Sequence, residues 1–511
     1  MRFAMALPSL FLRIRPLTLA LTLGGLSGCM LGPDYQRPAV SMPVDYKEAA
    51  GWKAATPRDG EARGDWWRVY GDARLDALLV QVEVSNQNVA QYLAQYAQAL
   101  ALTGQSRADL FPSLRGSAGM TRSGSGGGTY LTSSTGSSTS SATGSSGSEG
   151  VTQSSSRSVS GISDNYSAQL SLSWELDLWG KLRRTLEEDR ASAEASAAEL
   201  ADATLSAQSS LAQNYFQLRV LDERIRLYDI NIRSYERYLR VVRDQYEEGQ
   251  TSRATLAQAE TQLESARASS LDLRWQRAQY EHAIAILIGK APAEFSLPVA
   301  ERFEQRIPET SAGVASSLLE RRPDIAAAER DVAAANAAIG VAKSGYFPDL
   351  TLSASGGFQD SGTKKLFTVA NRFWSIGPSF SQTLFDFGST RAEVAQARAS
   401  YDAAVATYRQ TVLDALGEVE DYLVELRTLE TELAARRRAA DAARESERVT
   451  YDQYEEGMID YLDVATTQNT SLSEQQSVLQ LVGTQLVASV QLIVALGGGW
   501  QNETEAPATA R

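Results

Sequence analysis

A hexapeptide that occurs twice constrains the fold of this chain more than any other feature. The sequence Asp-Gln-Tyr-Glu-Glu-Gly fills residues 244–249 and returns at residues 452–457, so the copies are offset by 457 − 249 = 208 residues. The same offset relates Gly180 to Gly388. Repetition on this scale indicates one supersecondary unit used twice. For a chain of 511 residues, we therefore expect one elongated architecture with a two-fold internal repeat, in place of about three separate globular domains.

Long helices are predicted in both copies, because apolar residues recur at spacings of three and four as in a coiled-coil seam. In the first copy the seam consists of Leu211, Tyr215, Leu218, Leu221, Ile225, Tyr228, Ile232, Tyr235, Leu239, Val242 and Tyr246. In the second copy it consists of Val419, Leu423, Leu426, Leu429 and Leu433. Gly249 and Gly457 end the seams. We expect two helical hairpins with tips near these glycines and return arms at about residues 255–288 and 463–496.

Four segments alternate apolar and polar residues and are predicted to be strands. They cover about residues 111–121, 165–179, 348–358 and 373–386. Each is close to the 9–11 residues that a tilted strand needs to cross a bilayer. A soluble sandwich with one wet face is the alternative from this pattern alone. Four strands cannot close a barrel, and hydrocarbon does not tolerate an open sheet edge, so a membrane-spanning sheet would need strands from several chains.

The amino terminus is typical of an export signal. Arg2, Arg13 and Arg15 precede an apolar run over residues 17–26, and small residues follow up to Cys29, the single cysteine of the chain. Residues 1–28 resemble a bacterial lipoprotein signal, after which the cysteine is lipidated and starts the mature chain. The alternative is a buried structural cysteine. Residues 29–65 begin with a proline-rich stretch and are predicted to form an extended tether.

The remaining segments complete the predicted organisation. The first structural repeat covers residues 66–290, a linker covers residues 291–315, and the second repeat covers residues 316–500. Residues 501–511 are predicted to be a disordered tail. A Ser/Gly-rich tract at residues 123–160 joins two predicted strands, and we expect it to be a mobile loop that faces the cell exterior.

Composition argues against several classes of function. The net charge is −13, from 49 basic and 62 acidic residues, and no dense Lys/Arg patch is present, so nucleic acid is not an expected partner. One Cys and one His are too few ligands for a structural zinc site. No phosphate-binding loop, nucleophile motif or paired acid motif stands out. We therefore expect no cofactor, no metal and no enzymatic activity.

An ordered set of motifs along the mature chain resembles the TolC/OprM-type outer-membrane efflux channels, also called outer membrane factors, and in particular their lipoprotein branch. The motifs are Gly32-Pro33-Asp34-Tyr35, Trp66-Trp67 with Gly71-Asp72 and Leu75, Phe111-Pro112, Trp174 to Gly180, Arg321-Arg322-Pro323-Asp324-Ile325, Tyr346 to Leu350, Phe385-Asp386-Phe387-Gly388, the two Tyr-Glu-Glu-Gly turns and Ala495 to Trp500. Together they extend from about residue 32 to residue 500.

The resemblance implies a mixed α and β membrane protein. Three identical chains would each give four strands to a 12-stranded transmembrane β-barrel, which continues into a long periplasmic α-helical barrel. It also implies an outer-membrane location with a lipid anchor, contact with outer-membrane lipid, and docking onto a periplasmic adaptor protein. The energy source would be an inner-membrane transporter, expected to be of the proton-driven resistance-nodulation-division class. The protein would be a passive duct for small molecules. A lipid-anchored coiled-coil scaffold without a pore is the alternative, and it leaves the four strands unexplained.

The resemblance also places functional residues at the hairpin tips. In the family, the tips close the periplasmic end with a ring that includes aspartates after the second tip glycine. Asp463 matches one of these positions, but Thr466 occupies the second, and Asn469 replaces an arginine that some members use. We expect the gate at Leu462, Asp463 and Thr466, with a seal that depends more on Leu462 than on charge. The expected adaptor-docking residues are Tyr246, Gly249, Tyr454 and Gly457. His282 is expected to be a surface or packing residue.

Overall fold

The computed structural model describes residues 30–40, 47, 65–124, 162–300, 303 and 321–498. The described chain divides into two compact units. The first contains residues 30–31, 105–183 and 343–390, and the second contains the other described residues. The predicted signal, Cys29, most of the predicted tether, residues 125–160 of the Ser/Gly-rich tract, most of the linker after residue 300 and the tail from residue 501 lie outside the described residues.

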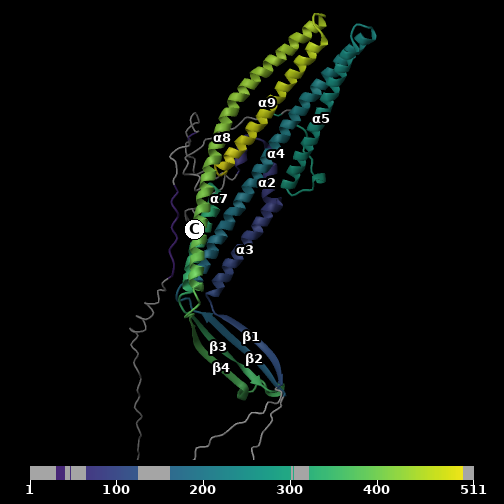
Figure 1. The fold of residues 1–511 in the computed structure, drawn as a ribbon. Helices are drawn as coiled ribbons and strands as arrows, with labels where there is room; N and C mark the ends of the chain where they lie inside the picture. The colour runs from purple at the N-terminus through teal and green to yellow at the C-terminus, as the bar shows by residue number, and fades with distance from the viewer. Residues whose placement is uncertain are drawn as a thin grey trace, which may run out of the picture. The chain divides into compact units, whose positions relative to one another are not determined.

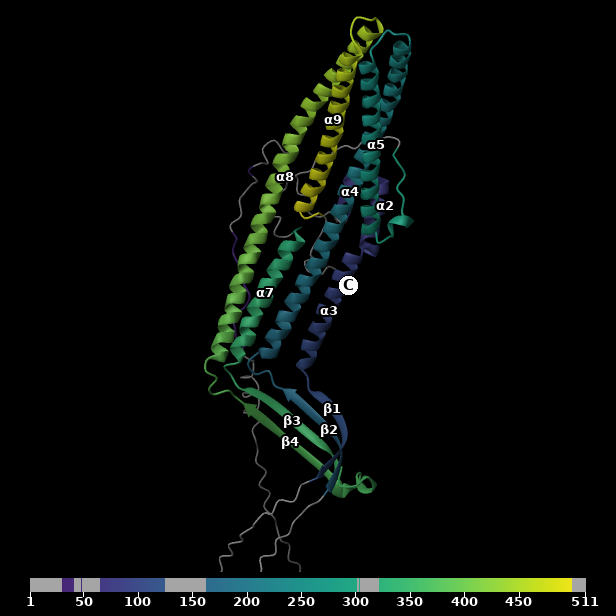
Figure 2. The ribbon, with the colours of Figure 1, turned by 45° about the vertical axis from the view of Figure 1, so that its right-hand side comes forward.

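A four-stranded antiparallel sheet forms the first unit, in the order β1-β2-β3-β4 (Figure 2). The strands are β1 (Ser113–Gly124), β2 (Ile162–Glu175), β3 (Asp349–Asp360) and β4 (Arg372–Ser381). Strands β1 and β4 are the edges of this sheet. The four predicted strands are therefore confirmed as a sheet, in a mixed α and β fold.

Two predicted strand ends were wrong, since β2 stops before residue 179 and β4 stops before residue 386. The residues that follow each strand form a turn that leads into a helix instead. The Asp177 carboxylate accepts the backbone N–H groups of Leu182 and Arg183, each at 3.1 Å. The Asp386 carboxylate accepts the backbone N–H groups of Gly388 at 2.9 Å and Thr390 at 2.8 Å. Such bonds satisfy the free N–H groups of a helix start, which favours a turn at each aspartate over a continued strand.

One face of the sheet is apolar across all four strands. Residues opposite each other in antiparallel strands project from the same face, and the register pairs Leu114 with Leu172, Leu172 with Ala354, and Ala354 with Ile376. Several large side chains on this face are exposed in the single chain, among them Leu114, Leu170, Trp374, Ile376 and Phe380. The unit therefore presents an uncovered apolar surface.

Helices make up most of the rest of the described chain (Figure 1). They are α2 (Ala73–Ser85), α3 (Gln87–Asp109), α4 (Lys181–Glu247), α5 (Arg253–Leu287), α7 (Pro323–Ser344), α8 (Ser389–Glu455) and α9 (Tyr461–Ala495), with a short 3₁₀ segment, η2 (Trp66–Tyr70), before α2. Helices α4 and α8 both have 67 residues, and α5 and α9 both have 35. The turns between the members of each pair lie at residues 248–252 and 456–460.

The second unit is held together by apolar clusters along α4 and α8. Trp67, Leu79 and Tyr215 belong to a cluster that joins η2 and α2 to α4, α5 and α9. A second cluster joins α7 and α9 to the α8 seam, whose five predicted residues are all buried. By length and composition α9 could cross a membrane, and 44% of its most apolar window is buried within the protein. Leu486 and Leu492 of α9 pack in the first and second clusters, so the helix contributes to both.

The leader that follows the cysteine is fixed on the helices. Its residues 33–40 have no regular secondary structure. Asp34 forms an ion pair with the buried Arg184 of α4 at 2.9 Å, and the Tyr35 hydroxyl donates to the Glu329 carboxylate of α7 at 3.1 Å. The Asn336 side chain donates to the carbonyl of Pro33 at 2.9 Å. The Gly-Pro-Asp-Tyr motif thus serves to attach the leader.

Buried charges attach the segment after α5 to α4. Asp222 accepts hydrogen bonds from Arg277 of α5 at 2.6 Å and from Arg219 at 3.1 Å, and its side chain is 1% exposed. The two arginines also donate to the carbonyls of Leu297 and Pro298, at 2.7 and 2.9 Å. A buried charge is tolerated when its hydrogen bonds are complete. The start of the predicted linker is therefore fixed by this network.

Replacing Asp222 with Ala should destabilise this part of the protein by about 3 kcal/mol, because the buried Arg219 and the largely buried Arg277 lose their shared carboxylate. Asp229→Ala is the matched control, since Asp229 also bridges α4 to an α5 arginine, Arg274 at 3.2 Å, but in an exposed position. An exposed pair contributes at most about 1 kcal/mol. Hydrogen exchange should quicken at the Leu297 and Ala300 amides in Asp222→Ala alone. Equal effects of the two substitutions would contradict this account.

Candidate functional site

Both hairpin turns are built by the same backbone hydrogen bonds. After α4, the Gly249 N–H bonds the Tyr246 carbonyl at 3.0 Å and the Gln250 N–H bonds the Gln245 carbonyl at 2.7 Å. After α8, Gly457 bonds Tyr454 at 2.9 Å and Met458 bonds Gln453 at 2.9 Å. This is the Schellman arrangement, which needs a left-handed residue at the glycine position. Gly249 has φ +75° and Gly457 has φ +71°, so the glycine that ends the repeated hexapeptide supplies the left-handed residue of the turn in both copies.

The helices after the two turns begin differently. The Ser252 hydroxyl caps α5 by accepting the Thr255 N–H at 3.1 Å. Asp460 stands at the corresponding position before α9, but its side chain makes no cap hydrogen bond, and the Asp463 N–H bonds the Asp460 carbonyl at 3.1 Å instead. Acidic residues near a helix start are favoured by the helix dipole. The α9 start is thus stabilised by charge, whereas the α5 start is stabilised by a neutral cap.

The two tip tyrosines occupy different environments although they come from the same hexapeptide. Tyr246 is exposed at the end of α4. Tyr454 is partly buried against an apolar cluster formed by α4, α5 and α9, its hydroxyl donates to Gln245 at 3.1 Å, and its ring lies 6.0 Å from that of Tyr461. Tyr246 is therefore available to a partner, and Tyr454 contributes mainly to contact between the hairpins.

The three predicted gate residues lie together in the first turns of α9 and are exposed in the single chain. Leu462 is 56% exposed, which is unusual for a large apolar side chain at a helix start. Leu462, Thr466 and Asn469 are spaced by four and three residues and so share one helix face. The opposite face is buried through Tyr461 and Val464. One helix therefore presents Leu462 outward while it packs on the first hairpin with its other side.

A buried polar bridge joins the two hairpins just behind the tips. The Tyr461 hydroxyl donates to the Gln262 side-chain oxygen at 3.2 Å, and the Gln262 amide donates to the Gln468 oxygen at 3.2 Å. Both glutamines are buried. Hydrogen bonds between buried groups specify one arrangement of the helices, because their loss would leave polar groups unsatisfied. The bridge therefore fixes how α9 lies on α5 near the turns.

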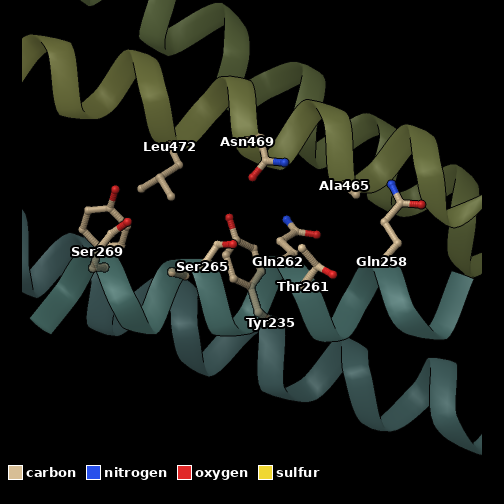
Figure 3. Close-up of a pocket in the computed structure, with 11 residues that line it drawn as sticks. Tyr235, Gln258, Thr261, Gln262, Ser265, Ser269, Ala465, Asn469 and Leu472 are labelled. Atoms are coloured by element: carbon tan, nitrogen blue, oxygen red, sulfur yellow. The ribbon is translucent and has the colours of Figure 1, made fainter.

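A cavity of about 370 Å³ lies beside this bridge, between α4 and α5 on one side and α9 on the other (Figure 3). Hydroxyl and amide side chains line most of it, including Thr261, Ser265, Ser269 and Asn469. Tyr235 of α4 also lines it, and burial raises the pKa of this phenol to about 12. Ala266, Ala465 and Leu472 add apolar surface, and no charged side chain lines the cavity, so the hairpins are separated here by a neutral space.

Sequence reasoning missed the Tyr461–Gln262–Gln468 bridge and this cavity. Tyr461 lies one residue before Leu462, about 100° around the helix, and so projects from a different side of α9; Gln468 follows it by seven residues on the buried face. A glutamine within an apolar stripe was the available signal. Cys29, the predicted lipidation site, lies outside the described residues. The gate and docking roles of the tip residues remain predictions.

Substituting Ala for Gly457 should destabilise the second turn by about 1–2 kcal/mol, because an L-residue there must adopt the left-handed conformation. The cost comes from the backbone alone, since nothing lies within 4 Å of an added Cβ. Gly417→Ala is the control: Gly417 lies within α8 with equal space around it, and Ala there should stabilise the helix by about 1 kcal/mol. Hydrogen exchange of the tip amides is the measurement. Protection unchanged by Gly457→Ala would contradict the turn assignment.

Comparison with known proteins identifies the family. The family model for the outer membrane efflux protein matches residues 78–290 and 314–498. The chain is 32% identical over 487 residues to the pyoverdine export outer membrane protein OpmQ of Pseudomonas aeruginosa, covering 94% of this chain and 97% of that one. It is 30% identical over 513 residues to the toluene efflux pump outer membrane protein TtgF of Pseudomonas putida, covering 97% and 99%.

A solved structure agrees with this result. The outer-membrane channel OprN is similar with a TM-score of 0.79 and 29% identity, over 93% of this chain and all of that chain. The described chain therefore has the fold of a known outer-membrane channel. The chain belongs to the outer membrane efflux protein family.

Proposed function

We propose that this protein is a passive, trimeric outer-membrane duct in a three-component efflux system. The observation that carries the proposal is the four-stranded sheet with one apolar face and two edge strands, β1 and β4. In hydrocarbon, edge N–H and C=O groups must be paired, so such a sheet requires closure by strands from other copies. Three copies would supply the twelve strands of a barrel. The number three rests on the family resemblance.

The two helical hairpins would supply the periplasmic part of the duct. Equal helix lengths in the two halves, and identical bonds in the two turns, support a duplicated unit that contributes twice to an α-helical barrel. A periplasmic adaptor would dock at the tips, where Tyr246 is exposed beside Gly249 and the second turn offers Gly457 next to the packed Tyr454.

Energy for transport would come from an inner-membrane transporter, which we place in the resistance-nodulation-division class. Small molecules would be the cargo, and the duct itself would carry out no chemical reaction.

A lipid-anchored scaffold without a pore is the competing function. Long hairpins with buried seams would suit it equally well. It does not account for a sheet with an exposed apolar face that includes Trp374, Ile376 and Phe380, because a patch of this kind on a soluble scaffold would cause aggregation. The duct explains this surface as the part that contacts lipid.

The gate would be formed by copies of Leu462 that meet where the second hairpins converge. Asp463 would line the same ring, but Thr466 and Asn469 add no charge to it. The Thr466 hydroxyl donates to the Leu462 carbonyl at 2.8 Å, so its proton is already used within α9. Apolar contact would therefore contribute most of the seal.

Leu462→Ser should raise resting conductance in planar bilayers more than Asp463→Asn, because it removes the apolar contact between copies. The closed state should respond only weakly to salt, since few charges take part in it. Leu271→Ser is the control, as Leu271 is an equally exposed leucine on α5 away from the tip. A larger effect of Asp463→Asn would show that the charge ring dominates. Wild-type conductance in both tip variants would place the gate elsewhere.

Lipidation at Cys29 would anchor the leader, whose Asp34 and Tyr35 are bound to α4 and α7. Mass spectrometry of the mature amino terminus should find an acylated Cys29. Cys29→Ser should abolish acylation while the barrel, held by its own apolar face, still reaches the outer membrane. An unmodified Cys29, or a mature chain that starts elsewhere, would exclude the anchor.

A further inference from the structure

The connection between β3 and β4 combines positive charge with exposed apolar side chains. Residues 361–371 contain Lys364 and Lys365 and no acidic residue, and Arg372 follows as the first residue of β4. All three cations are exposed. Phe367 is 72% exposed and Val369 is 79% exposed. Figure 2 shows this connection at the ends of β3 and β4.

The connection has a defined structure. The Lys365 carbonyl accepts hydrogen bonds from the Thr368 N–H at 3.1 Å, the Thr368 hydroxyl at 2.9 Å and the Asn371 side chain at 2.8 Å. Two short 3₁₀ turns, Thr363–Lys365 and Val369–Asn371, flank Phe367. These bonds order the backbone that carries the cations and the apolar side chains.

The connection folds toward the apolar face of the sheet. Phe358 belongs to that face by the alternation of β3, and the Phe367 ring contacts it edge to face at 5.5 Å between centroids. Arg372 pairs with Phe358 in the register, and Trp374 pairs with Gly356, so both project from the same face. The apolar face thus ends, at the β3–β4 connection, in aromatic rings with a cation beside them.

The neighbouring charges leave these cations available. At the same end of the sheet, Arg122 of β1 is ion-paired with Asp164 of β2 at 3.3 Å. The Asp360 carboxylate accepts the Ser361 N–H at 2.8 Å. Within the described part of the chain, none of the three cations Lys364, Lys365 and Arg372 forms an ion pair with a carboxylate. Aromatic side chains bind well at the level of the lipid headgroups, and neighbouring Lys and Arg side chains bind anionic headgroups. A surface that combines the two suits an anionic lipid.

We propose that residues 361–372 bind the phosphate headgroups of the lipid that surrounds the sheet. Lys364, Lys365 and Arg372 bind the phosphates, while Phe367 and Val369 insert among the adjoining acyl chains. The inference rests on the proposed membrane-spanning role of the sheet. A lipid fits this surface better than free phosphate, because the apolar residues adjoin the cations and continue the apolar face.

The test uses the full-length protein in detergent, titrated with diphosphoryl lipid A and examined by native mass spectrometry. The triple variant Lys364→Gln, Lys365→Gln, Arg372→Gln should lose affinity by about tenfold or more, since each cation near an anionic lipid surface contributes about fivefold. The control variant Arg398→Gln, Arg437→Gln, Arg438→Gln removes the same charge from exposed positions on α8 and should bind as wild type.

A second variant tests the apolar half of the surface. Phe367→Ser with Val369→Ser keeps every charge and should also weaken lipid A binding, whereas competition by inorganic phosphate should stay negligible. Equal binding by the triple variant and wild type would overturn the proposal, as would full displacement by inorganic phosphate. The same spectra report oligomeric state. A trimeric, conducting protein that lacks the lipid effect would remove this inference alone, and a non-conducting monomer would remove the proposed function together with it.

Discussion

The apolar stripe along α4 is the interaction on which the helical unit depends. Leu211 and Tyr215 pack in the cluster that contains η2 and α2, Tyr235 packs with α5, and Val242 packs with both α5 and α9 at the turns. In the middle of α4 the six consecutive residues 218–223 are all buried, so neighbouring segments cover every side of the helix there. Towards the turn only Tyr235 and Val242 of α4 are buried, so burial is reduced to a stripe.

Sequence periodicity was sufficient to place the long elements because their signals are repeated over many residues. The α8 seam from Val419 to Leu433 is buried throughout, and the four strands were found by strict alternation. The end of β2 was misplaced because alternation continues to Leu178, past Asp177, which already caps a helix. The end of β4 was placed too late although alternation is broken at Gln382, before Asp386 caps the next helix. Contacts between distant residues, such as Gln262 with Gln468 or Asp222 with Arg277, leave no periodic signal and could not be predicted.

The candidate site was predictable in its backbone and less so in its side chains. One hexapeptide specifies the same Schellman turn twice, because the requirement for a left-handed residue is local. The surroundings of its tyrosine depend on the partner helix, so Tyr246 is exposed while Tyr454 packs beside Tyr461. The copies also differ in their helix starts, with a hydroxyl cap at Ser252 and none from Asp460. The two turns thus share one backbone arrangement and differ in the contacts of their side chains.

The second hairpin combines features that suit a movable gate. Its start lacks a side-chain cap, and Leu462 is exposed in the single chain. Behind it, α9 contacts the first hairpin through the apolar cluster that contains Val242 and Val464 and through the neutral polar bridge that ends at Tyr461. Neutral hydrogen bonds contribute about 1 kcal/mol each, much less than a buried ion pair loses when it is broken. The Asp222 network therefore contributes more to the attachment of the far end of α5 than one hydrogen bond of the bridge contributes near the turns.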